Sequence, residues 1–190
     1  KQNKTETERR MAVLLETSLG FVTVDLNFEE CPLASQNFLA LCQAKRYNNV
    51  LFFNVQPGFI AQAGDPTGTG REGAAALGGG RFQAEKSPPR LNHMKRGTVG
   101  MIPFEDGAHT PENGSRFYIT LRDGLSSLDG KYTVFGTVAE DLDHVLEKFN
   151  GVICDQQGRP TLDIRIKHTY ILHNPFEHMT IDAPDSPTPD

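Results

Sequence analysis

Residues 52–70 read FFNVQPGFIAQAGDPTGTG, and this stretch decides how the rest of the chain is understood. Two short apolar runs, residues 51–55 and 59–63, flank Pro57-Gly58. A Pro-Gly pair between two runs of β-favouring residues predicts a hairpin. The glycines at the end of the stretch allow another backbone to approach closely. The stretch therefore predicts a sheet face beside a loop rich in backbone groups, which suits an extended peptide better than a small charged metabolite.

Size and composition indicate one ordinary domain. The chain has 190 residues, of which 37% are hydrophobic and 18 are glycine. A bilayer span needs about 20 apolar residues in a row, and no run approaches that length, so no membrane association is expected. No secretory signal pattern opens the chain. The net charge of −5 argues against a basic nucleic-acid surface. Three cysteines without a CxxC motif favour a reducing compartment and buried, apolar roles for these side chains.

The domain is expected over residues 11–176, between two polar ends. Residues 1–10 contain no apolar residue and are expected to be a disordered extension or an expression remnant. Residues 177–190 are acidic and rich in proline, which indicates a linker or tail.

Hydrophobic patterning predicts eight strands and two helices. The strands are expected over residues 13–17, 21–26, 51–55, 59–63, 98–102, 115–121, 133–138 and 162–172, and the helices over residues 32–44 and 140–149. Leu142, Val145, Leu146 and Phe149 form the apolar stripe of the second helix. Short connections imply antiparallel pairing. The prediction is a mainly β fold, a closed eight-stranded antiparallel barrel with two α-helices capping its ends.

Two motifs of other protein classes are present but lack their context. Residues 68–73 match G-x-G-x-x-G, yet glycines and prolines follow where a dinucleotide-binding fold needs a helix. His173 and His178 are separated by Pro175, which breaks any helix that would place both rings on one face. His93 and the remaining histidines have no partner at metal-ligand spacing. Neither a metal site nor a cofactor is expected.

From residue 11 to about residue 176, three segments resemble the cyclophilins, the cyclosporin-binding peptidyl-prolyl isomerases. PGFIAQAGD (57–65) is followed by GTG (68–70), and NGSRFYIT (113–120) and LDGKYTVFGTV (128–138) come later in the same order and spacing. The family fold is an eight-stranded antiparallel barrel with two capping helices, which agrees with the patterning.

The most similar branch is that of the RNA-binding cyclophilins, peptidyl-prolyl isomerase-like 4. The shared segments are AVLLET (12–17), NVQ (54–56), DPTGTGR (65–71), AEK (84–86) and DIRIKHT (163–169). This resemblance implies the N-terminal cyclophilin domain of a nuclear protein, with cytoplasmic location as the alternative. It also implies that RNA is bound only by a C-terminal domain, which these residues do not contain.

The resemblance implies a catalytic arginine, but Asn54 stands at that position. In cyclophilins this arginine donates to the prolyl nitrogen and weakens amide conjugation as the bond twists. Hydrogen bonds with a charged donor are roughly twice as strong as neutral ones, so isomerase activity is predicted to be low. The family tryptophan that contacts cyclosporin aligns with Ser127, and the family pocket histidine aligns with Tyr132. Cyclosporin binding is therefore expected to be weak or absent.

The remaining site residues follow from the same alignment. Gln62 would hold the substrate backbone. Arg116 replaces a family glutamine and would partly restore the missing positive charge; the alternative is an arginine that pairs with an acid at the rim. The segment between Met101 and Asn113 is longer than usual and would change this rim. The residues expected to bind proline peptides are Phe59, Ile60, Tyr118, Leu128 and Tyr132 at the proline slot, with Gly68 and Thr69 beside the neighbouring groove.

Two functions are consistent with these residues. The first is a weak or substrate-restricted prolyl isomerase. The second is a non-catalytic module that binds proline-containing peptides and tethers an RNA-binding protein to its partners. The replacements at Asn54, Ser127 and Tyr132 favour the second, whereas Phe59 and Gln62 permit both. Direct RNA binding by this domain is disfavoured by its acidity and by the lack of an aromatic and basic platform.

Overall fold

Strands dominate this computed structural model, which describes residues 11–104 and 110–174. The described part of the chain contains ten strands and two α-helices: β1 (Met11–Thr17), β2 (Gly20–Leu26), α1 (Pro32–Gln43), β3 (Val50–Leu51), β4 (Asn54–Gln56), β5 (Ile60–Ala63), β6 (Phe82–Gln83), β7 (Thr98–Pro103), β8 (Glu112–Thr120), β9 (Val134–Glu140), α2 (Val145–Asn150) and β10 (Arg165–His173). The predicted extension (1–10) and tail (177–190) lie outside the described residues.

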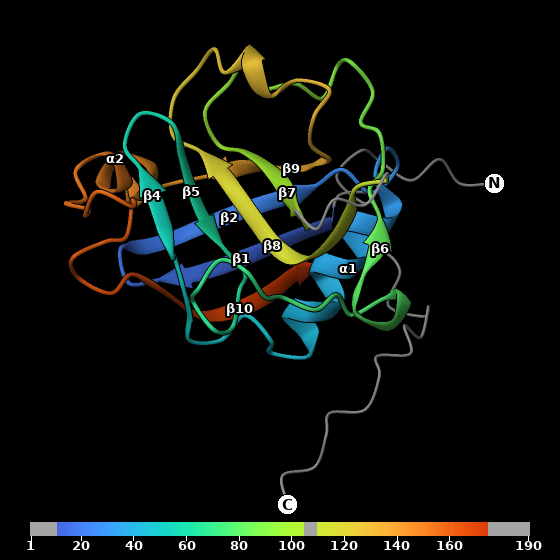
Figure 1. Cartoon of the computed structure of the whole chain (residues 1–190), viewed down its shortest axis with the longest axis horizontal. Coiled ribbons are helices and arrows are strands. Elements are labelled where there is room, and N and C mark those ends of the chain that lie inside the picture. Colours follow the sequence, from blue (N-terminus) through green and yellow to red (C-terminus); the bar gives the residue numbers. More distant parts are fainter. Residues whose placement is uncertain (1–10, 105–109, 175–190) are drawn as a thin grey trace, which may run out of the picture.

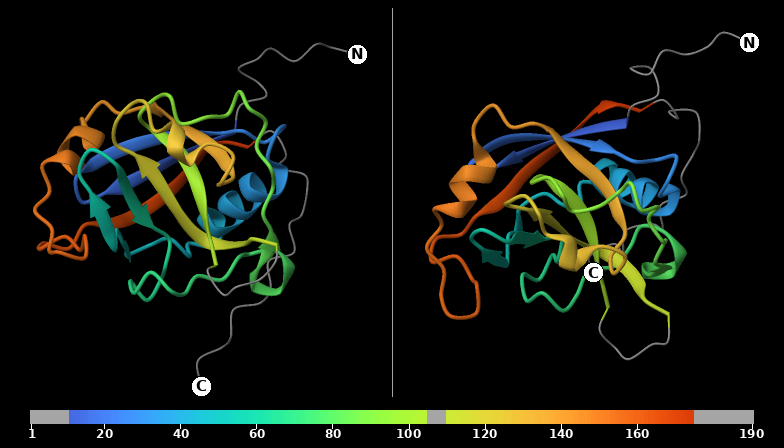
Figure 2. Two further views of the ribbon diagram at one scale, coloured as in Figure 1. Left: turned by 45° about the horizontal axis from the view of Figure 1, so that its top comes forward. Right: turned by 90° about the horizontal axis from the view of Figure 1, so that it is seen from above.

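The strands form one antiparallel sheet in the order β3-β10-β1-β2-β9-β7-β8-β5-β4, with β6 paired to β8. The sheet curls on itself, with α1 and α2 at opposite ends (Figure 1) and with β1, β2 and β10 facing the layer of β5, β7 and β8 (Figure 2). The mainly β class and the two helices are confirmed. In the part of the molecule that the structure describes, none of these helices is long and apolar enough to cross a membrane.

The predicted closed barrel of eight strands is not confirmed. The sheet has two edges, β3 and β4, which do not pair with each other in the described residues. The chain itself passes from one edge to the other through two phenylalanines. The amide of Phe52 donates to the carbonyl oxygen of Ile164 on one side, and that of Phe53 donates to Gln62 on the other. The result is a curled half-barrel whose seam is bridged by the chain.

Three strand predictions differ from the structure. The predicted strand 51–55 is divided into β3 and β4 because the two phenylalanines serve different edges. The two-residue β6 was not predicted. The last strand begins at Arg165 rather than at Leu162, whose side chain is 81% exposed.

Helix α1 forms much as predicted and packs into the open end of the curled sheet. Pro32 occupies its first turn, where a missing amide hydrogen costs nothing. Its start is capped from outside the helix, because the carboxylate of Glu85 accepts from the amides of Leu33 and Ala34 at 3.0 and 2.8 Å. The ring of Phe38 reaches the core, with ring-centroid distances of 5.1–5.3 Å to Tyr47, Phe117 and Phe135.

Helix α2 is shorter than the predicted helix 140–149. Glu140 ends β9, and His144 adopts a left-handed backbone with φ of 54°. The helix then begins at Val145, where the carboxylate of Asp141 accepts from the first amides. Val145, Leu146 and Phe149 are buried as predicted. Leu142 lies outside the helix and is 86% exposed, so its place in the stripe was wrong.

Candidate functional site

A second apolar cluster lies apart from the main core and contains the predicted proline slot. Its buried members are Ile60, Tyr118, Leu125 and Leu128, and Phe59, Ile102 and Tyr132 pack against them partly exposed. Hereafter this group is called the second cluster. Five of its members were predicted, and Leu125 and Ile102 were not. Leu125 directly follows the Asp123-Gly124 turn, so an apolar residue closing that turn was the available signal.

The strand register places three predicted residues in one row across the sheet. Asn54 of β4 is opposite Gln62 of β5, and Gln62 is opposite Tyr118 of β8. Directly opposed residues in antiparallel strands project to the same face. Asn54, Gln62 and Tyr118 therefore share the sheet face that carries the second cluster.

The hydroxyl of Tyr118 begins a chain of polar contacts that runs through the buried His93 to the partly exposed Asp129. Its hydroxyl lies 2.7 Å from Nε2 of His93, and Nδ1 of His93 lies 2.7 Å from Oδ1 of Asp129. The backbone amide of His93 also donates to this oxygen. The hydrogen bond from the His93 side chain lowers the pKa of Asp129. In the tautomer whose Nδ1–H donates to the Asp129 carboxylate, Nε2 of His93 accepts from the Tyr118 hydroxyl.

His93 was described from the sequence as a histidine without spaced partners. Its partners are instead brought together by the fold, since Asp129 sits in a turn and Tyr118 in a strand. The hydroxyl of Tyr118 fits because residue 100 is glycine: a Cβ there would lie 2.3 Å from it. Burial raises the pKa of the Tyr118 hydroxyl, so it stays protonated.

Tyr132 covers the ring of Tyr118. The two rings meet edge to face, with centroids 5.6 Å apart and planes at 76°. Tyr118 is only 2% exposed as a result of this and the surrounding apolar contacts. The cluster thus offers an aromatic floor beneath half-buried side chains, which is suited to a compact apolar ring.

The carboxamide of Asn54 is already engaged. Its Nδ2 donates to the carbonyl oxygen of Gln157 at 2.9 Å, and its Oδ1 accepts from Nε2 of Gln56 at 3.0 Å. The loop lies close on it, because a Cβ at Gly158 would come within 2.9 Å of Nδ2. One amide hydrogen and one oxygen of Asn54 are therefore directed at the protein itself.

The loop that contains Gly68 and Thr69 is organised by the buried carboxylate of Asp65. That carboxylate accepts from the hydroxyls of Thr67 and Thr69 and from backbone amides of the loop at 2.6–3.2 Å. Burial raises the pKa of Asp65, but these hydrogen bonds, led by the Thr67 hydroxyl, lower it overall. Gly68 is buried and Thr69 exposed. Neither belongs to the second cluster, so their place beside a neighbouring groove stays a prediction.

Arg116 joins this loop to the end of β7. Its guanidinium donates to the carbonyl oxygens of Gly70 and Pro103, the latter at 2.7 Å, and lies over the ring of Phe104 at 4.9 Å. The side chain is buried. It shares a strand face with Tyr118 because the two are two residues apart. Its predicted electrostatic role stays a prediction. The rim segment 105–109 lies outside the described residues.

A family model for the cyclophilin-type peptidyl-prolyl cis-trans isomerases matches residues 12–171. The chain belongs to this family. The predicted branch is confirmed as well: the human peptidyl-prolyl cis-trans isomerase-like 4 is 48% identical over 186 residues, which are 95% of this chain and 36% of that protein. A peptidyl-prolyl cis-trans isomerase of Arabidopsis thaliana is 47% identical over 88% of this chain and 33% of its own length. This cyclophilin chain thus spans about a third of these curated relatives.

Solved cyclophilins have the same fold. A cyclophilin-type isomerase of Cryptosporidium parvum superposes with a TM-score of 0.79 at 35% identity, covering 87% of this chain and 99% of that one. A second structure of the Cryptosporidium protein, in the presence of the dipeptide Ala-Pro, gives a TM-score of 0.78 at 34% identity, over 86% and 99% of the two chains.

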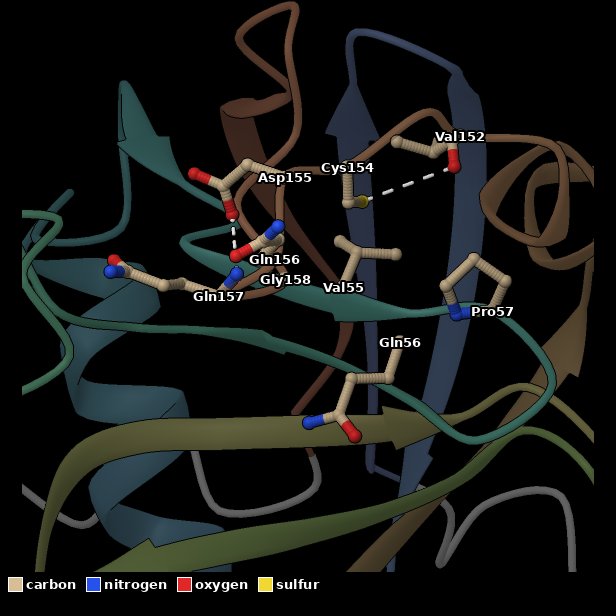
Figure 3. A pocket seen from close by; sticks show the side chains of 9 residues that line it. All are labelled: Val55, Gln56, Pro57, Val152, Cys154, Asp155, Gln156, Gln157 and Gly158. Carbon is tan, nitrogen blue, oxygen red and sulfur yellow. Dashed lines mark hydrogen bonds between the residues drawn. The ribbon is translucent and has the colours of Figure 1, made fainter.

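A hollow beside the strand that carries Asn54 lies apart from the second cluster. It has a volume of about 540 Å³ and lies between Val55–Pro57 and residues 152–158. Figure 3 shows Asp155, Gln156 and Gln157 along one side, and Val55 and Cys154 along another. Its lining includes no residue of the second cluster. The same loop holds Asn54 through Gln157, so this hollow borders the site from outside.

For metals, the described residues 11–104 and 110–174 contain no group of three or more ligating side chains. His178, paired with His173 in the sequence, lies outside these ranges.

Proposed function

We propose that this chain is a proline-peptide-binding cyclophilin domain with weak isomerase activity. The observation that carries the proposal is the engagement of Asn54. An efficient site needs a donor aimed at the prolyl nitrogen, whereas the Asn54 amide donates to Gln157 and accepts from Gln56. The family membership supports the reaction type, and the Cryptosporidium structure in the presence of Ala-Pro supports proline peptides as the ligand.

The reaction explains why the donor matters. Conjugation gives the peptide bond a rotational barrier of about 18–20 kcal/mol. A catalyst holds the proline ring, fixes the flanking backbone and stabilises the twisted amide. The second cluster supplies the first task, and Gln62 in the same row supplies the second. Removing one well-placed electrostatic donor costs on the order of 10²–10³ in rate in other enzymes. Loss of the arginine therefore leaves binding largely intact and slows turnover.

A second candidate is a binding module without catalysis. It is supported by the cover that Tyr132 forms over Tyr118, together with the replacement of the family tryptophan by the exposed Ser127. Both departures also support weak or absent cyclosporin binding. In this role the domain would tether a nuclear RNA-binding protein to proline-containing partners.

Exchange NMR on a labelled Ala-Pro-Phe-type peptide separates these candidates, because it reports binding and isomerisation together. We expect shifts that show binding and little added cis-trans exchange. The variant Asn54→Arg should raise the exchange rate by about 10-fold or more. The matched variant Asn54→Gln, a longer neutral amide, should not. Equal turnover in the natural chain and in Asn54→Arg would refute the loss-of-donor argument, and absence of binding would refute the function itself.

The cellular location and any binding of RNA are properties of the full-length protein. This chain matches about a third of the length of its human relative. We propose a nuclear location and RNA binding by a domain outside this chain. Imaging of the tagged full-length protein, and an RNA-binding assay on this chain beside the full-length protein, test both statements.

A further inference from the structure

A small cavity next to the second cluster shares one of its walls. It has a volume of about 150 Å³ and is lined by residues 84–87 and 130–133 and by Pro111. Tyr132 belongs both to this lining and to the second cluster. A ligand in the cavity would therefore contact the residue that also bounds the proline slot.

Most polar groups that line the cavity are already committed to the protein. Both carboxylate oxygens of Glu85 accept from the first amides of α1. The hydroxyl of Ser87 accepts from the amide of Val134, and that of Thr133 donates to the backbone of Glu85. Two further acids adjoin the lining along the chain: Asp129 is engaged by His93, and Glu112 pairs with Arg81 at 3.6 Å.

Two lysines in the lining, unlike Glu85, Ser87 and Thr133, are not held by contacts among the described residues. Lys86 and Lys131 are both exposed, one on each of the two segments that enclose the cavity. Within the described part of the chain, neither side chain takes part in an ion pair or hydrogen bond. The cavity thus combines a carboxylate whose two oxygens are turned to the amides of α1 with two lysines that make no ion pair in the described residues.

We propose that this cavity is a subsite for an acidic side chain, a carboxylate or a phosphate, on the same peptide whose proline occupies the second cluster. The proposal rests on the proposed function. Whole small-molecule ligands fill pockets of roughly 300–1,000 Å³, and a 150 Å³ cavity is the size for one side chain. The shared Tyr132 places that side chain a few residues at most from the proline.

The net negative charge of the chain sharpens what the proposed subsite predicts. With a net charge of −5, the molecule as a whole repels anionic peptides. A preference for acidic peptides therefore has to come from a local group of cations, and it has to depend on the position of the acid relative to proline.

The test uses single-proline peptides in which Glu, with Gln as its neutral match, is moved through the three positions on either side of proline. Phosphoserine and serine form a second pair. Affinity is measured by titration at low and at high salt. We expect tighter binding by about 2- to 5-fold at one position or two adjacent ones, the range of an exposed ion pair, and a loss of this gain at high salt. A gain limited to phosphoserine also supports the subsite and assigns it to phosphate.

Five variants locate the effect. Lys86→Ala and Lys131→Ala should each reduce the gain, whereas the Lys→Arg exchanges should keep it. Lys167→Ala, an equal charge change on exposed β10, should leave it unchanged, and thermal unfolding confirms that each variant is folded. An even gain at all positions, or equal losses in Lys86→Ala and Lys167→Ala, would overturn the subsite. Binding of the neutral Gln peptides tests the proposed function separately, because it needs no acidic group.

Discussion

The hydroxyl of Tyr118 and Nε2 of His93 lie 2.7 Å apart beneath the second cluster. Both groups are buried. Through His93 the contact continues to Asp129, which directly follows Leu128 of the cluster. The floor of the proposed proline slot and the turn that forms one of its sides are therefore joined by hydrogen bonds and not only by apolar packing.

Removal of the Tyr118 hydroxyl should lower the free energy of unfolding. In Tyr118→Phe the buried Nε2 of His93 loses its partner, and an unsatisfied buried polar group costs about 1–3 kcal/mol. We expect a decrease of that size in the free energy of unfolding, measured with urea. The control is Tyr132→Phe, whose hydroxyl makes no hydrogen bond within the described residues and whose loss should be nearly neutral. Equal effects of the two substitutions would contradict this role of His93.

Acid should destabilise the loop held by Asp65. The folded-state pKa of this carboxylate is lowered overall from its ordinary value of 3.8. A lowered folded pKa means that its contribution is fully present above about pH 5 and is lost as the pH falls through the folded value. Asp65→Asn should cost on the order of 2–3 kcal/mol at neutral pH, and its difference from the natural chain should shrink below about pH 4.

The pH dependence is measured by urea unfolding between neutral and acidic pH. Asp163→Asn is the matched control, because among the residues that the structure describes the side chain of Asp163 makes only an exposed ion pair with Arg165. This substitution should change stability by less than about 1 kcal/mol. A difference between Asp65→Asn and the natural chain that stays constant into strong acid would show that the carboxylate charge is not what holds the loop.

Glu85 should stabilise α1 from outside the helix. It accepts from two amides at the helix start, where negative charge also interacts favourably with the helix dipole. Glu85→Ala should lower the free energy of unfolding by about 1–2 kcal/mol, and Glu85→Gln by less because an amide oxygen still accepts. Glu29→Gln, a change at an exposed acid, is the control. If Glu85→Ala had the same free energy of unfolding as the natural chain, the contacts of Glu85 with the helix start would not contribute to stability.

Variants of Arg116 separate two roles for its guanidinium: a clamp that holds the structure together, and a positive charge that contributes to the site. Its planar fork reaches two carbonyl oxygens, which a lysine cannot match. As a clamp alone, Arg116→Lys and Arg116→Gln should both reduce stability by about 1–3 kcal/mol, with unchanged turnover per folded molecule. If the charge serves the site, the Lys variant should retain exchange activity that the Gln variant loses. Unfolding and exchange NMR on the same samples separate these outcomes.

The local pattern predicted the hairpins and the first helix, because each depends on residues near one another in the sequence, whereas the proline-slot residues were assigned from the family resemblance and their role stays a prediction. Phe59 and Ile60 follow a turn, and Tyr118 and Leu128 lie in recognisable family segments. Their grouping in one cluster agrees with that alignment. The division of strand 51–55 was not predictable, since the amides of Phe52 and Phe53 pair with strands from distant parts of the chain.

The contacts of polar side chains were the part that the sequence could not supply. His93 and Asp129 have no informative spacing and meet only because the fold brings a turn beneath β8. Whether Asn54 is available as a donor depends on the loop at Gln157, which is remote in sequence. Leu142 has the spacing of a helical stripe, but it lies before the helix. The Asp141 carboxylate accepts from the amide of Val145, where α2 begins.

The pairing of β1 with β10 joins the first described strand to the last. During synthesis on a ribosome, β1 can pair with β2 early, yet its other side stays unpaired until His173 has left the exit tunnel. An unpaired strand edge is a template for aggregation. The final closure of the sheet is thus a late step that joins residues from the two ends of the described chain.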